Sequence, residues 1–132
     1  MSLRLLLPVA LCAALFMACS SVTPEEQAAK AAKSYYDLLV DGQVESFLEG
    51  KVGSNSLPND YMEQLVKAHR QYLSDIKEKH GGLREVLVSP NVAHCDSSLH
   101  LTYAFLLLCY GDSAQEEVTV PMVEVDGEWR MK

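Results

Sequence analysis

The stretch KEKHGGLREVLV, residues 77–88, divides the sequence into a helical half and a strand half. Before it, apolar residues recur at helical spacing, and after it, β-branched and alternating residues are separated by short turn sequences. Gly81 and Gly82 are typical of the end of a helix. Helices followed by strands in this order predict an α+β fold with the helices on one face of an antiparallel sheet.

Three helices are predicted before this junction. Thr23-Pro24-Glu25-Glu26 supplies an N-cap, a proline in the first helical position and two acids in the first turn, so a helix is expected over residues 24–40. A second, short helix is expected over 43–49. The third, over 58–79, has one apolar stripe, formed by Tyr61, Leu65, Ala68, Tyr72 and Ile76.

Four strands are predicted after the junction, over residues 85–93, 99–110, 117–125 and 128–132. Asp126-Gly127 is a favoured two-residue hairpin turn. Pro90 and Pro121 lack the N–H that a central strand needs, so each predicts a bulge or an edge position. The expected fold is therefore three N-terminal helices packed on a curved four-stranded antiparallel sheet.

The beginning of the chain has the features of an export signal. Arg4 precedes an apolar run over residues 5–18, which has the length of a signal-peptide core and is too short to span a bilayer comfortably. The junction Ala18-Cys19 resembles a bacterial lipobox, where cleavage leaves a diacylated N-terminal cysteine. A plain secretory signal cut nearby is the alternative.

These features predict a signal peptide over residues 1–18, a lipidated Cys19 with a tether reaching residue 23, and a single domain over 24–132. The chain is then expected in the bacterial cell envelope, outside the cytoplasm and attached to the membrane by lipid on Cys19. Eleven basic against 18 acidic residues, a net charge of −7, argue against nucleic acid as a partner. No phosphate loop, C-x-x-C or H-E-x-x-H motif is present, so no cofactor is predicted.

The first helix and the last hairpin carry a resemblance. Residues 35–43, YYDLLVDGQ, and the Gly127-Glu128-Trp129 hairpin resemble the nuclear transport factor 2-like (cystatin-like) superfamily, and more closely its small bacterial lipoprotein domains of unknown function, of the Bacteroidetes type. The resemblance implies a cone with an apolar pocket between sheet and helices. Members include enzymes, ligand carriers and dimerisation domains, so the fold does not settle the function.

Aromatic residues are the candidates for lining such a pocket: Tyr35, Tyr61, Tyr72, Tyr103 and Phe105. A catalytic site would draw on the same tyrosines together with Tyr36 and His69. However, no Asp or Glu stands in the middle of an inward strand face, where an isomerase of this fold would keep its base. The prediction is therefore a non-enzymatic binding or assembly module for a small apolar ligand, itself or an envelope partner. The alternative is an isomerase- or hydratase-like enzyme that uses pocket Tyr and His.

The strand over 99–110 is apolar on both faces near its end. One face, with Tyr103 and Phe105, is expected to cover the helices. The other face would then expose Leu106, Leu108 and Tyr110, which predicts a surface for a homodimer or another partner. Burial of these three residues within the monomer is the alternative.

The remaining candidates lie around the first strand turn. Cys95 and Cys109 are separated by roughly 30 Å along their hairpin, beyond the reach of a disulfide, so two free thiols are predicted, with Cys109 packed in the core. His94 and His100 would face each other across a three-residue turn and, with Asp96, could form a zinc set. The alternative is that these are exposed polar residues at a hairpin end, and no metal site is predicted.

Overall fold

The computed structural model describes residues 21–132, so the predicted signal peptide 1–18 and the predicted lipidation site Cys19 lie outside the described residues. The helices are α2 (Pro24–Val40), α3 (Val44–Glu49), the short 3₁₀ helix η2 (Ser54–Ser56) and α4 (Asn59–His80). The strands are β1 (Leu83–Asp96), β2 (Leu101–Tyr110), β3 (Gln115–Val125) and β4 (Glu128–Met131). The three predicted α-helices and the four predicted strands are confirmed.

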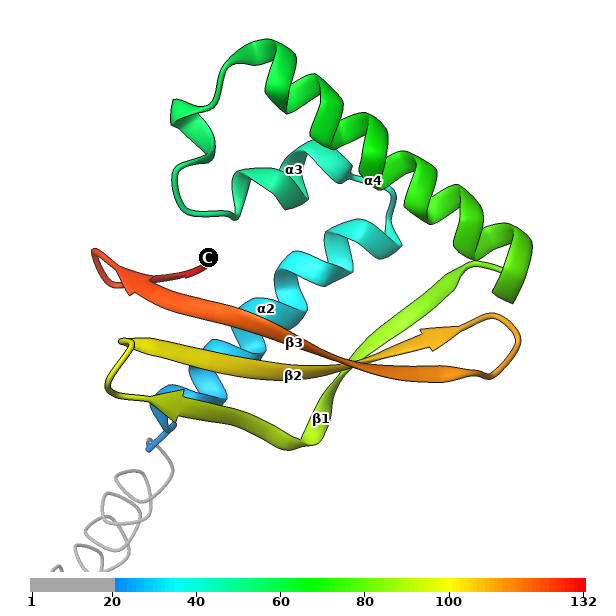
Figure 1. The fold of residues 1–132 in the computed structure, drawn as a ribbon. Helices are drawn as coiled ribbons and strands as arrows, with labels where there is room; N and C mark the ends of the chain where they lie inside the picture. Colours follow the sequence, from blue (N-terminus) through cyan, green and yellow to red (C-terminus); the bar gives the residue numbers. More distant parts are fainter. Residues whose placement is uncertain (1–20) are drawn as a thin grey trace, which may run out of the picture.

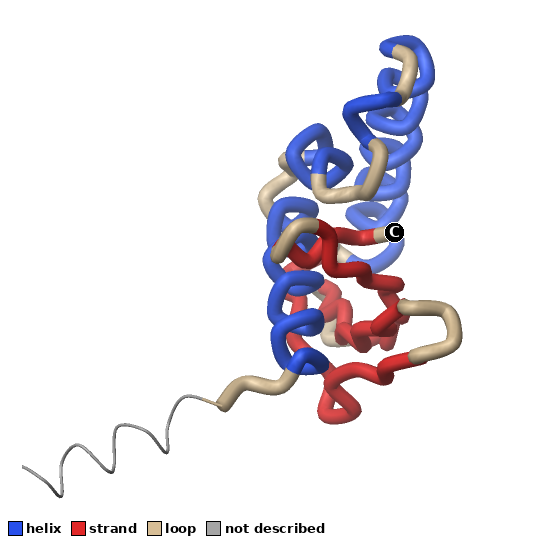
Figure 2. The backbone as a smooth tube through the Cα atoms, turned by 90° about the vertical axis from the view of Figure 1, so that its left-hand side faces the viewer, coloured by secondary structure: helices blue, strands red, loops and turns tan. Residues whose placement is uncertain are grey.

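The four strands form one antiparallel sheet in the order β1-β2-β3-β4 (Figure 1). Helix α2 lies against one face of this sheet, while most of α4 lies beyond one end of the sheet (Figure 2). The helices of residues 21–132 leave the opposite face of the sheet uncovered. The core therefore lies between α2, α3 and the inner face of the sheet.

Helix α2 begins and packs as its sequence predicts. The Thr23 hydroxyl accepts a hydrogen bond from the Glu26 N–H at 3.2 Å, which satisfies one free donor of the first turn. Three alanines, Ala28, Ala29 and Ala32, are buried against the sheet. Because their side chains are small, the helix backbone lies close to the strands.

Helix α4 is held to the sheet at its C-terminal end. The helix ends at Gly81 in the left-handed conformation, φ 75°. The Asp112 N–H then donates to the His80 carbonyl at 2.8 Å, and the Gly111 N–H donates to the Gly82 carbonyl at 2.9 Å. These two bonds join the end of α4 to the β2–β3 turn.

Strand β1 contains a bulge between Val88 and Ala93. Val88 pairs with Leu106 and Ala93 pairs with Ala104, so five steps along β1 match two along β2. Pro90 lies in this bulge, as predicted. Val92, also in the bulge, has a φ of 58°, a conformation that β-branched residues rarely adopt.

The prediction for Pro121 is wrong, because this residue lies in the interior strand β3 and pairs there with Tyr103. Its carbonyl oxygen accepts a hydrogen bond from the Lys132 N–H at 2.9 Å. The nitrogen of a strand residue points to the same side as its carbonyl, so the ring nitrogen faces β4 and not β2. The ladder between β2 and β3 therefore loses no donor.

The prediction that Tyr103 and Phe105 of β2 point toward the helices is also wrong. Leu106, Leu108 and Tyr110 are buried in the core and do not form an outer interface, so the alternative of burial within the monomer is correct. Tyr103 and Phe105 are half-buried on the opposite face.

The neighbouring strands explain this choice of face. Leu108 pairs with Val86 of β1, and Ala104 pairs with Val120 of β3. Both partners are buried, at 1% and 4% exposure. Residues paired across strands share a face, so the even-numbered residues of β2 join the apolar faces of its neighbours and meet the helices.

Candidate functional site

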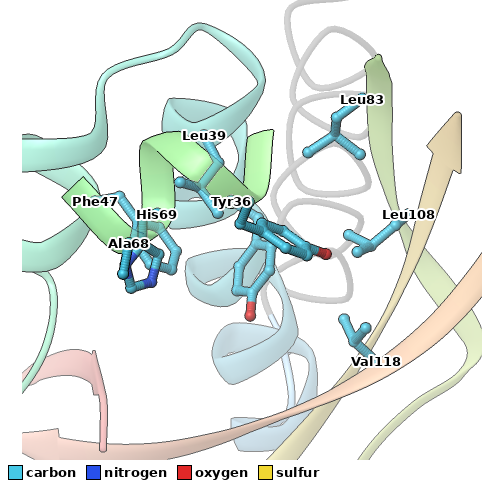
Figure 3. Close-up of a pocket in the computed structure, with 9 residues that line it drawn as sticks. Tyr36, Leu39, Phe47, Ala68, His69, Leu83, Leu108 and Val118 are labelled. Atoms are coloured by element: carbon cyan, nitrogen blue, oxygen red, sulfur yellow. The ribbon is translucent and has the colours of Figure 1, made fainter. Parts of the chain in front are cut away.

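A cavity of about 310 Å³ lies between the helices and the sheet. Its lining comes from α2, α3, α4, β2 and β3 and the start of β1: Tyr36, Leu39, Phe47, Ala68, His69, Tyr72, Leu83, Leu108 and Val118. Figure 3 shows Phe47, Ala68 and His69 on one side and Leu83, Leu108 and Val118 on the other. The lining is mainly apolar, and no carboxylate contributes to it.

His69 is held in one orientation by its own helix. Its Nδ1 lies 2.8 Å from the Leu65 carbonyl oxygen. A carbonyl oxygen can only accept, so Nδ1 carries a proton, and Nε2 of the neutral ring is then an acceptor. The ring also packs against Phe47, with centroids 5.7 Å apart. The cavity is therefore lined by an imidazole whose tautomer is set by the α4 backbone.

Two tyrosines supply the other polar groups of the cavity. The Tyr36 ring stands edge-on to Phe47, with centroids 5.2 Å apart and planes at 89°. Burial raises the pKa of the Tyr36 hydroxyl, and the neighbouring Tyr72 raises it further. The Tyr36 hydroxyl thus keeps its proton at neutral pH and is available as a hydrogen-bond donor.

A second hollow of about 280 Å³ adjoins the cavity and shares Tyr72 with it. The buried Tyr110 hydroxyl donates to Glu116 Oε2 at 2.8 Å. Burial and this bond to Glu116 raise the pKa of Tyr110, so the phenol stays protonated. The His80 ring stacks on Tyr110 at 4.7 Å, and His80 Nδ1 lies 2.8 Å from Asp112 Oδ2. This hollow is more polar than the cavity.

The structure places one of the five predicted pocket residues, Tyr72, in the cavity wall. Tyr103 and Phe105 are on the outer face of the sheet and do not line it. The Tyr35 hydroxyl donates to the Trp129 carbonyl instead. Tyr61 is exposed and lines a separate groove beside the C-terminal Lys132. For Tyr35, Tyr103 and Phe105 the pocket prediction is wrong, whereas Tyr61 lines a hollow other than this cavity.

Several lining residues were missed because no local signal marks them. Leu39 and Phe47 belong to apolar faces that the sequence does show, yet core and cavity positions have the same pattern. Leu83 and Val118 come from different strands and meet α4 only in the folded chain. The helical stripe that contains Ala68 and Tyr72 was one available signal. Tyr36 and His69, which the sequence offered only as catalytic candidates, also line the cavity.

The thiol prediction is confirmed, since Cys95 is free and exposed and Cys109 is free and buried. The predicted facing of His94 and His100 is wrong. His94 pairs with Tyr103, and His100 lies in the turn with a φ of 54°. Residues 21–132 contain no cluster of three or more His, Cys, Asp or Glu side chains suited to a metal ion.

Comparisons with known proteins establish the fold. No family model matches the chain, and no curated protein matches it. The crystal structure of a proposed NTF2-like transpeptidase from Campylobacter jejuni superposes with a TM-score of 0.58 at 12% sequence identity, covering 76% of this chain and 92% of that chain. The predicted α+β fold is therefore confirmed as nuclear transport factor 2-like (NTF2-like). At this identity the similarity concerns the fold alone.

None of the helices in residues 21–132 is long and apolar enough to cross a membrane. The cavity is a partly open, mainly apolar hollow with tyrosine hydroxyls and the His69 imidazole in its wall. Such a lining buries a hydrophobic body and forms a small number of hydrogen bonds to it.

Proposed function

We propose that this chain is a lipid-anchored protein of the bacterial envelope whose NTF2-like domain binds a small, mainly apolar ligand without changing it chemically. The observation that carries the ligand-binding part is the cavity between α2, α3, α4 and the sheet. Its lining is mainly apolar and includes no carboxylate, which favours binding over catalysis, because an isomerase of this fold would be expected to keep a carboxylate base beside the reacting atoms.

The volume and the lining of the cavity limit the size and polarity of the ligand that it can hold. A volume of about 310 Å³ is at the small end of ligand sites and corresponds to about ten waters of liquid volume. The apolar lining suits an alkyl chain or a small ring system. The Tyr36 hydroxyl can donate to a ligand oxygen, and His69 Nε2 can accept from a ligand hydroxyl. We therefore expect a short amphiphile such as a medium-chain alcohol.

An isomerase- or hydratase-like activity is the second candidate, and the fixed tautomer of His69 is what favours it. An unprotonated Nε2 beside a cavity could act as a general base. It would work without the carboxylate that such an enzyme of this fold would use. A ligand recovered from the protein unchanged after long incubation supports binding, and a new product would support the enzyme.

Ligand binding is tested on the full chain purified from the envelope of its own host. Native mass spectrometry should show one bound molecule per chain, and 1-decanol should compete with it. Ala68→Trp narrows the cavity from α4 and should lower decanol binding at least tenfold. Gln64→Trp, one turn away and outside the cavity, should leave binding unchanged. Equal binding by both variants would disprove this site.

Lipid attachment is tested separately. Cys19→Ala should release the protein from the membrane fraction, while Cys12→Ala, in the same leader, should not. A mass increase equal to a diacylglyceryl group on Cys19 is the direct readout. If the Cys19→Ala protein still partitions with membranes, the lipid anchor is wrong, and the cavity proposal is unaffected.

A further inference from the structure

The hollow beside the cavity is a second place where this chain can hold part of a ligand. We call it the polar hollow, and its volume of about 280 Å³ is close to that of the cavity. It lies where the C-terminal end of α4 meets the β2–β3 turn (Figure 1). The side chains in its wall that matter for binding are Tyr72, Asp75, Lys79, His80, Tyr110 and Glu116.

The cavity continues into the polar hollow along both of its walls. On α4, the Tyr72 side chain lines both spaces. On the sheet, Leu108 of the cavity pairs directly with Glu116 of the hollow, and residues paired across strands share a face. Val118 of the cavity is two residues from Glu116 on β3, so both point to the inner face. A molecule that lies in the cavity can therefore extend one end into the hollow.

Glu116 presents a carboxylate oxygen to this space. The Tyr110 hydroxyl donates to Glu116 Oε2 at 2.8 Å, which orients the carboxylate. Tyr110 is only 4% exposed, so this support belongs to the packed core. The other oxygen, Oε1, accepts no hydrogen bond from the residues that the structure describes. The inner face of the sheet thus ends in an oriented negative group with a free acceptor.

A second carboxylate and an aromatic ring line the hollow from α4. Asp75 Oδ1 accepts a hydrogen bond from the Gln71 side chain at 3.0 Å, whereas Oδ2 has no donor among residues 21–132. The Tyr72 ring is 44% exposed and can present its face to a cation. Carboxylates that accept charge-assisted hydrogen bonds, together with an aromatic face, form a suitable site for an ammonium group.

The cationic side chains of the hollow do not cancel its negative charge. His80 is paired with Asp112, with His80 Nδ1 2.8 Å from Asp112 Oδ2. Lys79 is exposed and is the remaining cation of the lining. Two carboxylates, Asp75 and Glu116, against one lysine leave the lining negative. This excess attracts a cationic group and repels an anionic one.

From these observations we propose that the bound amphiphile carries a primary ammonium head, which Glu116 and Asp75 hold in the polar hollow while its alkyl chain fills the cavity. The inference rests on the proposed function, because it requires a ligand in the cavity. It narrows the expected ligand from an alcohol to an alkylamine, which is charged at pH 7 as a lysine side chain is.

Two probes of equal chain length separate the head from the tail. 1-Decylamine and 1-decanol differ only in the head group, so titration calorimetry of the full chain at pH 7 measures what the head contributes. The amine should bind at least about fivefold more tightly than the alcohol. Equal affinities overturn the ammonium head and leave the cavity proposal intact, whereas absence of binding by both probes overturns the two together.

The position of the alkyl chain is tested with Ala68→Trp, which narrows the cavity. Both probes should bind this variant at least about tenfold more weakly, because both place their chain in the cavity. An Ala68→Trp protein that binds the amine as tightly as the parent would show that the amine does not use the cavity, and the proposal would be wrong.

Charge removal tests the residues that hold the head. Glu116→Gln keeps an oxygen for the Tyr110 hydroxyl, so it should lower amine binding by about threefold or more and leave decanol binding unchanged. Glu124→Gln, the same change eight residues further along β3, should alter neither. Lys79→Met removes a like charge and should strengthen amine binding by about twofold. Unchanged amine binding in Glu116→Gln, or weaker amine binding in Lys79→Met, contradicts the assignment.

Discussion

The Tyr35 hydroxyl donates a hydrogen bond to the Trp129 carbonyl oxygen at 2.6 Å, linking residues 94 positions apart in the sequence. The Trp129 indole N–H reaches back to the Gln27 side chain at 3.4 Å. Helix α2 and the last hairpin are therefore joined directly, at the end of the molecule away from the α4 C-terminus.

Removing the Tyr35 hydroxyl should destabilise the fold. Tyr35→Phe leaves the Trp129 carbonyl without this donor, so we expect a loss of about 1 kcal/mol and a melting temperature lower by about 3–6 °C. Tyr36→Phe is the matched control, because the Tyr36 hydroxyl makes no hydrogen bond to another residue of 21–132. It should change stability by less than about 0.5 kcal/mol. Equal effects of the two variants would mean that the bond to Trp129 contributes nothing.

The Tyr35 ring leaves no room for a side chain at residue 50, which is glycine. A Cβ on Gly50 would lie 2.5 Å from Tyr35 Cδ1, so the ring would have to move. Gly50→Ala should cost about 1–3 kcal/mol by overpacking. In a Tyr35→Leu background the same change should cost less, since a smaller side chain can yield. Thermal unfolding of the four proteins of this cycle measures the coupling, and strict additivity would contradict the contact.

Gly111→Ala should be more damaging than Gly42→Ala. A Cβ on Gly111 would lie 2.5 Å from the Gly81 carbonyl oxygen, a backbone atom that is held by the α4 C-terminus. Gly42 has a φ of 76° but open space around it. Alanine there costs only the strain of the left-handed backbone conformation, about 1 kcal/mol. We expect a loss of about 2–4 kcal/mol for Gly111→Ala in urea unfolding. The reverse order would show that the α4 attachment is loose.

The two thiols should differ sharply in accessibility. Iodoacetamide should label Cys95 in the native protein and Cys109 only after denaturation, because Cys109 is 1% exposed. Peptide mapping by mass spectrometry assigns each site. Labelling of Cys109 at the rate of Cys95 under native conditions would contradict the packing at the end of β2.

Asp112 should stabilise the fold only while it is ionised. The hydrogen bond from His80, with a further bond from the Ala114 N–H, holds the pKa of Asp112 below its ordinary value. A carboxyl with a lowered folded pKa contributes stability above its ordinary pKa, and this is lost as the pH falls through the lowered value. The melting temperature of the Asp112→Asn variant should therefore fall less between pH 6 and pH 3 than that of the parent protein. Equal falls would disprove the His80 contact.

The element order could be predicted because the change in periodicity after Gly82 is strong. Thr23-Pro24 marks the start of α2, and Asp126-Gly127 marks the last turn. The facing of β2 could not be predicted from β2 alone, because its odd-numbered and its even-numbered residues are both mainly apolar. The register with Val86 and Val120 decides it, and register depends on which strands pair.

The cavity was less predictable than the fold for a related reason. Its walls come from segments that are far apart in sequence, and a tyrosine that lines a cavity has the same helical spacing as one that fills a core. Tyr35 and Tyr36 illustrate this. They are adjacent on α2, yet one is bonded to the last hairpin and the other lines the cavity.

The bulge in β1 also has a consequence for how the chain can change over evolution. Five steps along a regular strand would turn Ala93 to the opposite face from Val88, but the bulge resets the alternation, so both residues pair on the inner side. The intervening residues, 89–92, have no partners on β2. Homologous chains can therefore gain or lose residues here without a shift in the pairing that follows, whereas a change of one residue in β2 would turn every later side chain to the wrong face. Length variation among relatives should concentrate in this segment.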